Sequence, residues 1–324
     1  MRSWWIESKG SRTEIEARDV PVPQPGAGQV LVKMRAAGLN RGELIASHGL
    51  TKPGAAKPAG VEGAGEVTGL GAGVTQLAVG SRVMGRCPGA FAEYALMDAR
   101  EAIPVPQRLS WDEAAAVPLA FMVVHDMLIA QGGLTRDEWL LVTGISSGVG
   151  VAALQTAKML GAKVIGTSGS KQKLELLKPL GLDLGLHTRA PDFNAAVMEA
   201  TGGRGANLAV NTVGGSVFPE IVRSLAFEGR VAIVGYVDGV LKAEIDLDAL
   251  HAKRLKVFGV SNKLRNAEQR ATSVRGFVED ILPAIADGRI KPLVEQRFAL
   301  DELPRAKESM ESNRHTGKIV VQMK

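Results

Sequence analysis

The residues best suited to chemistry lie in a short glycine-rich turn, from Thr143 to Gly150, between two apolar segments. Small residues let a phosphate pair approach the backbone, and the N–H groups and positive dipole of a following helix attract its charge. The spacing departs from the strict G-x-G-x-x-G form, so the flanking pattern carries most of the evidence. We predict that a dinucleotide pyrophosphate contacts Gly144, Ser146, Ser147, Gly148, Val149 and Gly150.

The second apolar segment ends without a carboxylate, reading Gly166-Thr-Ser-Gly-Ser-Lys-Gln-Lys173, and the first acidic residue is Glu175. An acidic side chain about 20 positions past the turn would bind the adenosine ribose of NAD. A ribose 2′-phosphate would instead find the hydroxyls of Ser168 and Ser170 and the ammonium groups of Lys171 and Lys173. The sequence therefore predicts NADPH rather than NADH, the alternative being that Lys171 and Lys173 are merely solvated at a helix start.

Later strands should contribute further groups, because open α/β sheets bind ligands beyond the carboxyl ends of their strands. Backbone groups from Phe258 to Val260 could hold the nicotinamide carboxamide. Tyr236 could face the nicotinamide or be a satisfied surface tyrosine. The residues predicted here to line the cofactor site are Asn211, Gly214, Gly235, Phe258, Gly259 and Val260.

The pattern around the turn is that of a strand, a helix and a second strand. Leu140 to Val142 form an apolar run, the helix has apolar residues at helical spacing and stops at Gly161, and residues 163–167 form the next strand. Strands alternate with helices from about 121 to 260, which predicts an α/β fold with a doubly wound parallel sheet. The later strands are expected at Leu208–Asn211, Arg230–Val234 and Leu255–Val260.

The flanking segments have a different pattern. Residues 1 to about 120 resemble short strands separated by proline and glycine. The remainder, 261–324, predicts a helix over roughly 267–287, a short helix from Leu303 and a strand over Lys318–Val321. Because one terminal strand cannot form a sheet, we expect this tail to return to the first domain.

Composition narrows the function. A formal charge of +5 could suggest nucleic acid, but the basic residues are dispersed and aromatic residues make up only 4%. The start lacks the apolar region of a signal peptide, and no apolar stretch reaches membrane-spanning length, so we expect a cytoplasmic protein. Cys87 is the only cysteine, which fits a reducing compartment and excludes a cysteine-rich zinc lobe.

With these residues and several further motifs, the sequence resembles members of the medium-chain dehydrogenase/reductase superfamily, specifically its zinc-independent NADPH:quinone oxidoreductases. The resemblance implies a mostly-β GroES-like catalytic domain split around a Rossmann domain, and a homodimer joined through edge strands, for which Lys256–Ser261 is the candidate. The further motifs are Ala36–Asn40, Gly60–Val67, Gly80–Gly85, Gly89–Tyr94, Asn211–Gly215 and Gly317–Val320.

Metal catalysis is not expected. Zinc-dependent relatives place a cysteine and a histidine ligand at positions that correspond here to Asn40 and Val61. Valine cannot coordinate zinc, and an amide replaces a thiolate poorly. Without a metal, we interpret Glu62 as a structural carboxylate.

Without a bound metal cation, the class of substrate that the protein could reduce is narrower. A simple ketone forms a localised alkoxide, whereas quinones and conjugated enones spread the incoming charge, so hydrogen-bond donors can suffice. We therefore predict NADPH-dependent reduction of a quinone or conjugated enone. The alternatives are reduction of an acrylyl or longer enoyl thioester, and a non-catalytic NADPH-binding protein that serves as a sensor or structurally.

The resemblance also suggests catalytic candidates. Asn40 would line the substrate cleft as a donor or, alternatively, tie a turn to the backbone. Tyrosines that many relatives carry are replaced here by Ile45 and Thr51, which leaves His48 and Thr51 as possible proton sources. Arg314, in the tail, would lie near the adenosine phosphate.

Overall fold

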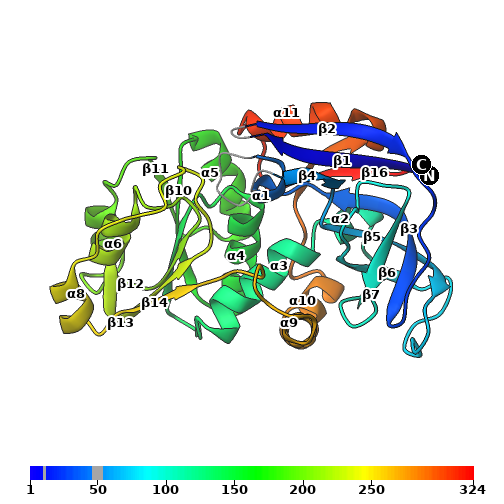
Figure 1. Ribbon diagram of the computed structural model, residues 1–324. Coiled ribbons are helices and arrows are strands. Elements are labelled where there is room, and N and C mark those ends of the chain that lie inside the picture. Colours follow the sequence, from blue (N-terminus) through cyan, green and yellow to red (C-terminus); the bar gives the residue numbers. More distant parts are fainter. Residues whose placement is uncertain (10–11, 46–53) are drawn as a thin grey trace. The chain divides into compact units, whose positions relative to one another are not determined.

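The computed structural model describes residues 1–9, 12–45 and 54–324. The chain forms two compact units (Figure 1). Unit 1 comprises Met1–Met122 and Asn266–Lys324, and unit 2 comprises Val123–Arg265. The helix α3 (Pro118–Val124) contains the first boundary between them.

Unit 2 is built on a six-stranded parallel sheet with the order β11-β10-β9-β12-β13-β14. The central strands are apolar runs because both of their faces are buried, as for Leu140, Leu141 and Val142 of β9. The strands are β9 (Trp139–Thr143), β10 (Lys163–Ser168), β11 (Leu184–His187), β12 (Ala206–Asn211), β13 (Leu225–Ile233) and β14 (Lys256–Gly259). The predicted α/β parallel sheet is confirmed.

Helices cover both faces of this sheet, with α4 and α6 on opposite sides (Figure 1). Phe193 before α6 and Ile221 of α7 pack against the apolar side chains of β9, β10 and β12. The helix α4 ends at Met159, and Gly161 adopts the left-handed conformation (φ 80°) predicted for its stop. The helical elements are η2 (His125–Ala130), α4 (Gly148–Met159), α5 (Lys171–Leu177), η3 (Lys178–Leu180), α6 (Asn194–Ala200), α7 (Phe218–Arg223) and α8 (Leu247–Ala252).

Unit 1 contains a seven-stranded sheet, with the order β15-β16-β3-β5-β6-β8 and with β7 also paired to β3, and a three-stranded sheet with the order β2-β1-β4. The tail contributes β15 and β16, and β16 runs antiparallel to β3. The strands are β1 (Arg2–Lys9), β2 (Arg12–Asp19), β3 (Gln29–Gly38), β4 (Gly54–Pro58), β5 (Glu62–Leu70), β6 (Arg82–Arg86), β7 (Tyr94–Asp98), β8 (Ile103–Pro104), β15 (Val294–Ala299) and β16 (Lys318–Gln322).

The tail helices depart from the prediction in one respect. The expected helix over 267–287 is two helices, α9 (Ala267–Asp280) and α10 (Leu282–Asp287). Pro283 lies in the first turn of α10, where its missing N–H costs nothing, and it could not have continued α9 without removing a helical hydrogen bond. The other helices of unit 1 are α1 (Arg41–Leu44), α2 (Trp111–Ala115), η4 (Leu300–Glu302) and α11 (Leu303–Glu311).

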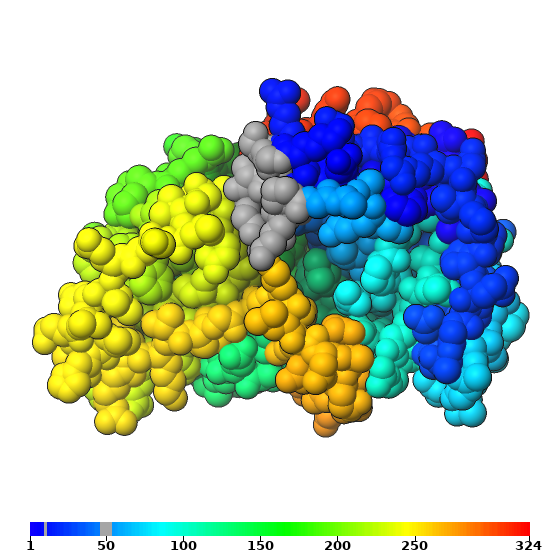
Figure 2. Space-filling view, in the orientation of Figure 1, coloured from blue at the N-terminus to red at the C-terminus, as the bar shows by residue number. Residues whose placement is uncertain are grey.

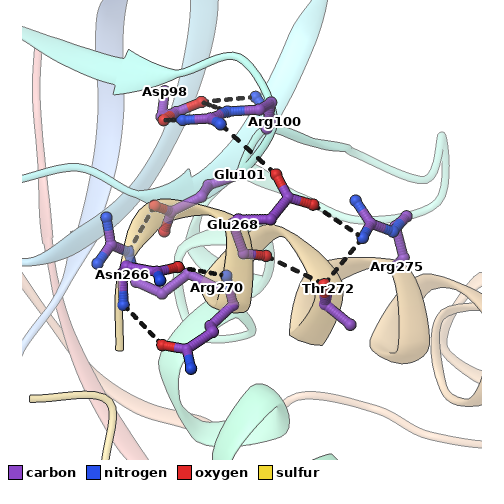
Figure 3. Close-up of polar contacts among 9 residues, drawn as sticks. Asp98, Arg100, Glu101, Asn266, Glu268, Arg270, Thr272 and Arg275 are labelled. Carbon is purple, nitrogen blue, oxygen red and sulfur yellow. Dashed lines mark hydrogen bonds and ion pairs between the residues drawn. The ribbon is translucent and has the colours of Figure 1, made fainter. Parts of the chain in front are cut away.

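Charged side chains fasten α9 to the loop between β7 and β8 (Figure 3). Arg270 Nε donates to Oε1 of the buried Glu101 at 2.7 Å, and Arg100 Nη1 lies 3.7 Å from Glu268 Oε2. Asn266 and Gln269 form a capping box at the helix start. The tail is thus tied to unit 1 from the point where it leaves unit 2.

No helix among the residues described is long and apolar enough to cross a membrane.

Candidate functional site

The glycine-rich turn forms a tight cradle between β9 and α4. Gly144 has φ 70°, and a Cβ there would lie 2.7 Å from Thr212 Oγ1. A Cβ on Gly150 would lie 2.5 Å from the Ile145 carbonyl oxygen, so both positions require glycine. Ser147 caps α4 by accepting from Gly150 N at 3.1 Å. This turn brings Gly144, Ser146, Ser147, Gly148, Val149 and Gly150 together at the N-terminus of a twelve-residue helix, which suits a pyrophosphate.

The end of β10 lies beside this cradle. The hydroxyl oxygens of Ser146 and Ser168 are 3.4 Å apart. Ser170 N donates to Ser168 Oγ at 3.3 Å, and the Ser170 hydroxyl caps α5 by accepting from Lys173 N at 3.4 Å. Lys171 is exposed in the first turn of α5. The hydroxyls of Ser146, Ser168 and Ser170 thus lie together in one patch at the end of β10, where α5 begins with Lys171, and the Ser170 hydroxyl is already used as a cap.

Arg189 also belongs to this patch, although it was not predicted from the sequence. Arg189 follows β11, the strand paired with β10, and its side chain lies so close to Gly169 that a Cβ there would overlap its Nε and Cδ atoms. An exposed guanidinium at this edge is a strong ligand for a phosphate. The sequence does carry a signal for Arg189, because it is a basic residue just past β11, the third strand of this sheet along the chain. We expected phosphate ligands only at the end of β10, the second strand.

Asn211 shapes the site rather than presenting a free amide. Its Oδ1 accepts from Val213 N at 3.1 Å and from Gly214 N at 2.9 Å, and its Nδ2 donates to Gly214 O at 2.9 Å. Gly214 adopts φ 130°, and Gly235 N donates to Asn211 O at 3.3 Å. The Asn211 side chain therefore fixes the loop after β12, while Gly214 and Gly235 leave the backbone close to the sheet edge.

The ends of β13 and β14 adjoin this loop. Tyr236, three residues past β13, is half-buried. Phe258 and Gly259 end β14, and Val260 N donates to Ile233 O at 3.0 Å. A Cβ built on Gly259 would meet no atom within 4 Å, so space is open beside this backbone. Tyr236, Phe258, Gly259 and Val260 thus lie at the carboxyl ends of two neighbouring strands, at the same sheet edge as the glycine-rich turn.

In unit 1, Asn40 belongs to a buried polar cluster with Glu62 and Lys318. Asn40 Nδ2 donates to Glu62 Oε1 at 2.8 Å and to Gly38 O at 3.3 Å, so both amide hydrogens are engaged. Lys318 Nζ donates to Asn40 Oδ1 at 2.8 Å, Glu62 Oε1 at 2.6 Å and Leu39 O at 2.9 Å. Glu62 Oε2 accepts from Leu119 N at 2.6 Å. In this geometry the Asn40 amide bonds to the backbone of its own turn and to Glu62, as expected if it ties a turn, and both Glu62 oxygens accept hydrogen bonds within unit 1.

Glu43 lies three residues after Asn40 and was not predicted either. Its Oε1 accepts from Gly60 N, while its Oε2 is buried without a hydrogen bond to any described residue. Burial raises the pKa of the Glu43 carboxyl to about 7, and the nearby Glu62 contributes in the same direction. A carboxyl that keeps its proton near neutral pH is a candidate acid in the Asn40 region.

Three further predicted residues are His48, Thr51 and Arg314. His48 and Thr51 lie outside the described residues. Arg314 lies in unit 1 on the turn after α11, where its Nε donates to Ser312 Oγ at 3.4 Å. No group of three or more His, Cys, Asp or Glu side chains suited to a metal occurs in the described part of the chain.

Two family models match the chain. Residues 26–107 match the "Alcohol dehydrogenase GroES-like domain", and residues 148–274 match "Zinc-binding dehydrogenase". The chain belongs to the medium-chain dehydrogenase/reductase superfamily. It is quinone oxidoreductase-like, with a GroES-like domain and a Rossmann domain, as the sequence predicts.

The relatives of this chain differ greatly in length. A phenolphthiocerol/phthiocerol polyketide synthase component of Mycobacterium tuberculosis is 33% identical over 98% of this chain, which spans only 14% of that protein's length. Prostaglandin reductase-3 of Bos taurus is 33% identical, covering 94% of this chain and 84% of that protein. The Escherichia coli quinone oxidoreductase, solved with NADPH, superposes with a TM-score of 0.89 at 26% identity over 99% of this chain and all of that one.

Proposed function

We propose that this protein reduces quinones or conjugated enones by metal-free hydride transfer from NADPH. The observation that carries the proposal is the end of β10. Ser168 faces Ser146 of the phosphate cradle, and Lys171 and Arg189 flank the strand end. Residues 166–174 contain no carboxylate to bind an unphosphorylated ribose. A doubly anionic 2′-phosphate suits this basic patch.

The residues of unit 2 fit a dinucleotide along the sheet edge. The turn between β9 and α4 would hold the pyrophosphate, the Ser168 patch the 2′-phosphate, and the Phe258–Val260 backbone the carboxamide. When bound, NADPH would supply a hydride from its nicotinamide ring. The protein would orient that ring and exclude water from it. Holding the reacting atoms in place lowers the barrier to hydride transfer.

The Asn40 cluster supports chemistry without zinc. An ammonium group, Lys318 Nζ, lies within hydrogen-bond distance of both Asn40 Oδ1 and Glu62 Oε1. A second cation at these oxygens would be repelled by this fixed charge. A conjugated acceptor needs less charge stabilisation than an isolated ketone, so hydrogen-bond donors can replace the metal. Candidate donors to the product are Tyr236, His48, Thr51 and the protonated Glu43 carboxyl.

We further propose that the enzyme is a homodimer joined through β14. This strand is at one edge of the unit 2 sheet, paired only with β13 among the described strands. Val257 within it is 45% exposed, and an apolar edge strand tends to associate unless it is covered. The segment before α8 includes three further exposed apolar residues, Val237, Val240 and Leu241. The yellow surface in Figure 2 belongs to this part of the sequence.

Two measurements test the activity. Titration with NADPH and NADH should give a much lower Kd for NADPH. Steady-state NADPH oxidation should then be followed with 1,4-benzoquinone, methyl vinyl ketone and acrylyl-coenzyme A. Turnover of the quinone or the free enone supports the proposal. A strong preference for the thioester supports a thioester reductase, and tight NADPH binding without turnover indicates a sensor or structural protein.

A further inference from the structure

A chain of polar contacts links the π-helix η2 to the end of β14. Gln131, which follows η2, donates from Nε2 to Asp126 Oδ1 at 3.1 Å and to the carbonyl oxygen of Gly259 at 3.2 Å. Arg265 Nη2 donates to Asp126 Oδ2 at 3.0 Å. The Asp126 side chain is 8% exposed and therefore holds a fixed position between the other two.

The π-helical turn makes this contact possible. In an α-helix, residues five apart lie roughly 140° apart around the axis, so Asp126 and Gln131 would face different directions. Here Gln131 N donates to Asp126 O at 3.0 Å, the i to i+5 bond of a π-helix, which places the two side chains on one side. Such turns are rare and are frequently found at functional sites.

The contact fixes one peptide group at the sheet edge. The carbonyl oxygen of Gly259 accepts from Gln131, and the N–H of Val260 in the same peptide donates to Ile233 O at 3.0 Å. Held from both sides, this plane cannot rotate without breaking a hydrogen bond. The neighbouring backbone groups of Phe258 and Val260 are oriented by it, beside the open space at Gly259.

We propose that Gln131 is a positioning residue that orients the Phe258–Val260 backbone toward the nicotinamide carboxamide. The inference rests on the proposed function. Gln131 acts at the nicotinamide end because its side chain bonds to Asp126 and Gly259, whereas the pyrophosphate cradle and the Ser168 patch belong to other strands.

The test is Gln131→Met, which keeps the length of the side chain and removes its donor. The Kd values of NADPH and of 2′,5′-ADP, which lacks the nicotinamide, should be measured with kcat for the best substrate. We expect the NADPH Kd to rise about 3- to 10-fold, the loss of one hydrogen bond, and kcat to fall, while the Kd of 2′,5′-ADP is unchanged. The melting temperature checks that the variant is folded.

The matched control is Glu228→Gln, which breaks the exposed Arg254–Glu228 pair in the same unit and should change none of these values. Equal changes for NADPH and 2′,5′-ADP would mean that Gln131 supports only the fold, and unchanged NADPH binding would also overturn the inference. If the wild-type protein fails to bind NADPH, the proposed function fails instead, so the two failures are distinguishable.

Discussion

Lys318 Nζ lies 2.6 Å from Glu62 Oε1 in the core of unit 1, and the two side chains are 8% and 0% exposed. The pair joins the last strand of the chain to the start of β5 and holds Asn40 between them. Two buried charges of this kind are stable only while both are present.

Removing the lysine alone should therefore be costly. Lys318→Met leaves the Glu62 carboxylate buried without its counter-charge, and we expect the free energy of unfolding to fall by roughly 3 to 5 kcal/mol. Urea denaturation followed by circular dichroism measures this. The double variant Glu62→Gln/Lys318→Met should recover part of the loss. Arg289→Gln, which breaks an exposed pair with Asp287, should leave the midpoint almost unchanged. A loss of stability for Arg289→Gln as large as that for Lys318→Met would contradict the prediction.

Arg189 should determine cofactor preference. If its guanidinium binds the 2′-phosphate, Arg189→Leu should raise the Kd of NADPH roughly 10- to 100-fold and leave that of NADH unchanged, because only NADPH carries this phosphate. Isothermal titration calorimetry with NADPH and with NADH measures both Kd values. The control is Lys178→Met, since Lys178 is a similarly exposed cation in unit 2 that pairs with Glu175. A parallel rise for NADH would show that Arg189 acts on the fold.

Glu43 should make stability depend on pH. Burial raises the pKa of its carboxyl from 4.5 to about 7, so between these values the native state holds a proton that the unfolded state lacks. Stability then falls as the pH rises through this window and stays low above it. Glu43→Gln, which can still accept from Gly60 N, should be more stable than the wild type by up to about 3 kcal/mol at about pH 8, and equal to it below about pH 4.5. Denaturation at both pH values checks this, and a constant difference would refute it.

The proposed dimer can be tested at β14. Val257→Glu places a charge on the exposed edge strand, where two copies would bring like charges together. Light scattering after size-exclusion chromatography should show a dimer for the wild type and a monomer for the variant. The control is Val79→Glu, an equally drastic change at a 65% exposed position of unit 1. A wild-type monomer, or a dimer that survives the Val257 change, would place the interface elsewhere or remove it.

The sequence predicted those parts of the site that are local in the chain. The cradle from Gly144 to Gly150 follows from residue type, strand pattern and helix start, all within one segment, and so does the end of β10 at Ser168. Arg189 was not predicted as a phosphate ligand, because its position beside Gly169 depends on the pairing of β11 with β10. The local pattern around Arg189 does not reveal this pairing.

Contacts between distant segments were beyond the reach of local patterns. The hydrogen bond between Gln131 and Gly259 spans 128 positions, and that between Lys318 and Glu62 spans 256. A π-helical turn has no distinctive composition, so no local pattern placed Asp126 and Gln131 together. The break at Ile281 could have been predicted, because Pro283 cannot continue a helix.

The pairing of β16 with β3 has a consequence for how the chain acquires its structure during synthesis. All strands of unit 2 lie in one continuous stretch, so its sheet can close as soon as residue 265 has left the ribosome. The edge of β3 and the carboxylate of Glu62 must wait for residues 318–322. A chain whose synthesis stops after α11 would therefore have a complete parallel sheet in unit 2, whereas β3 in unit 1 would keep an unpaired edge that is prone to aggregation.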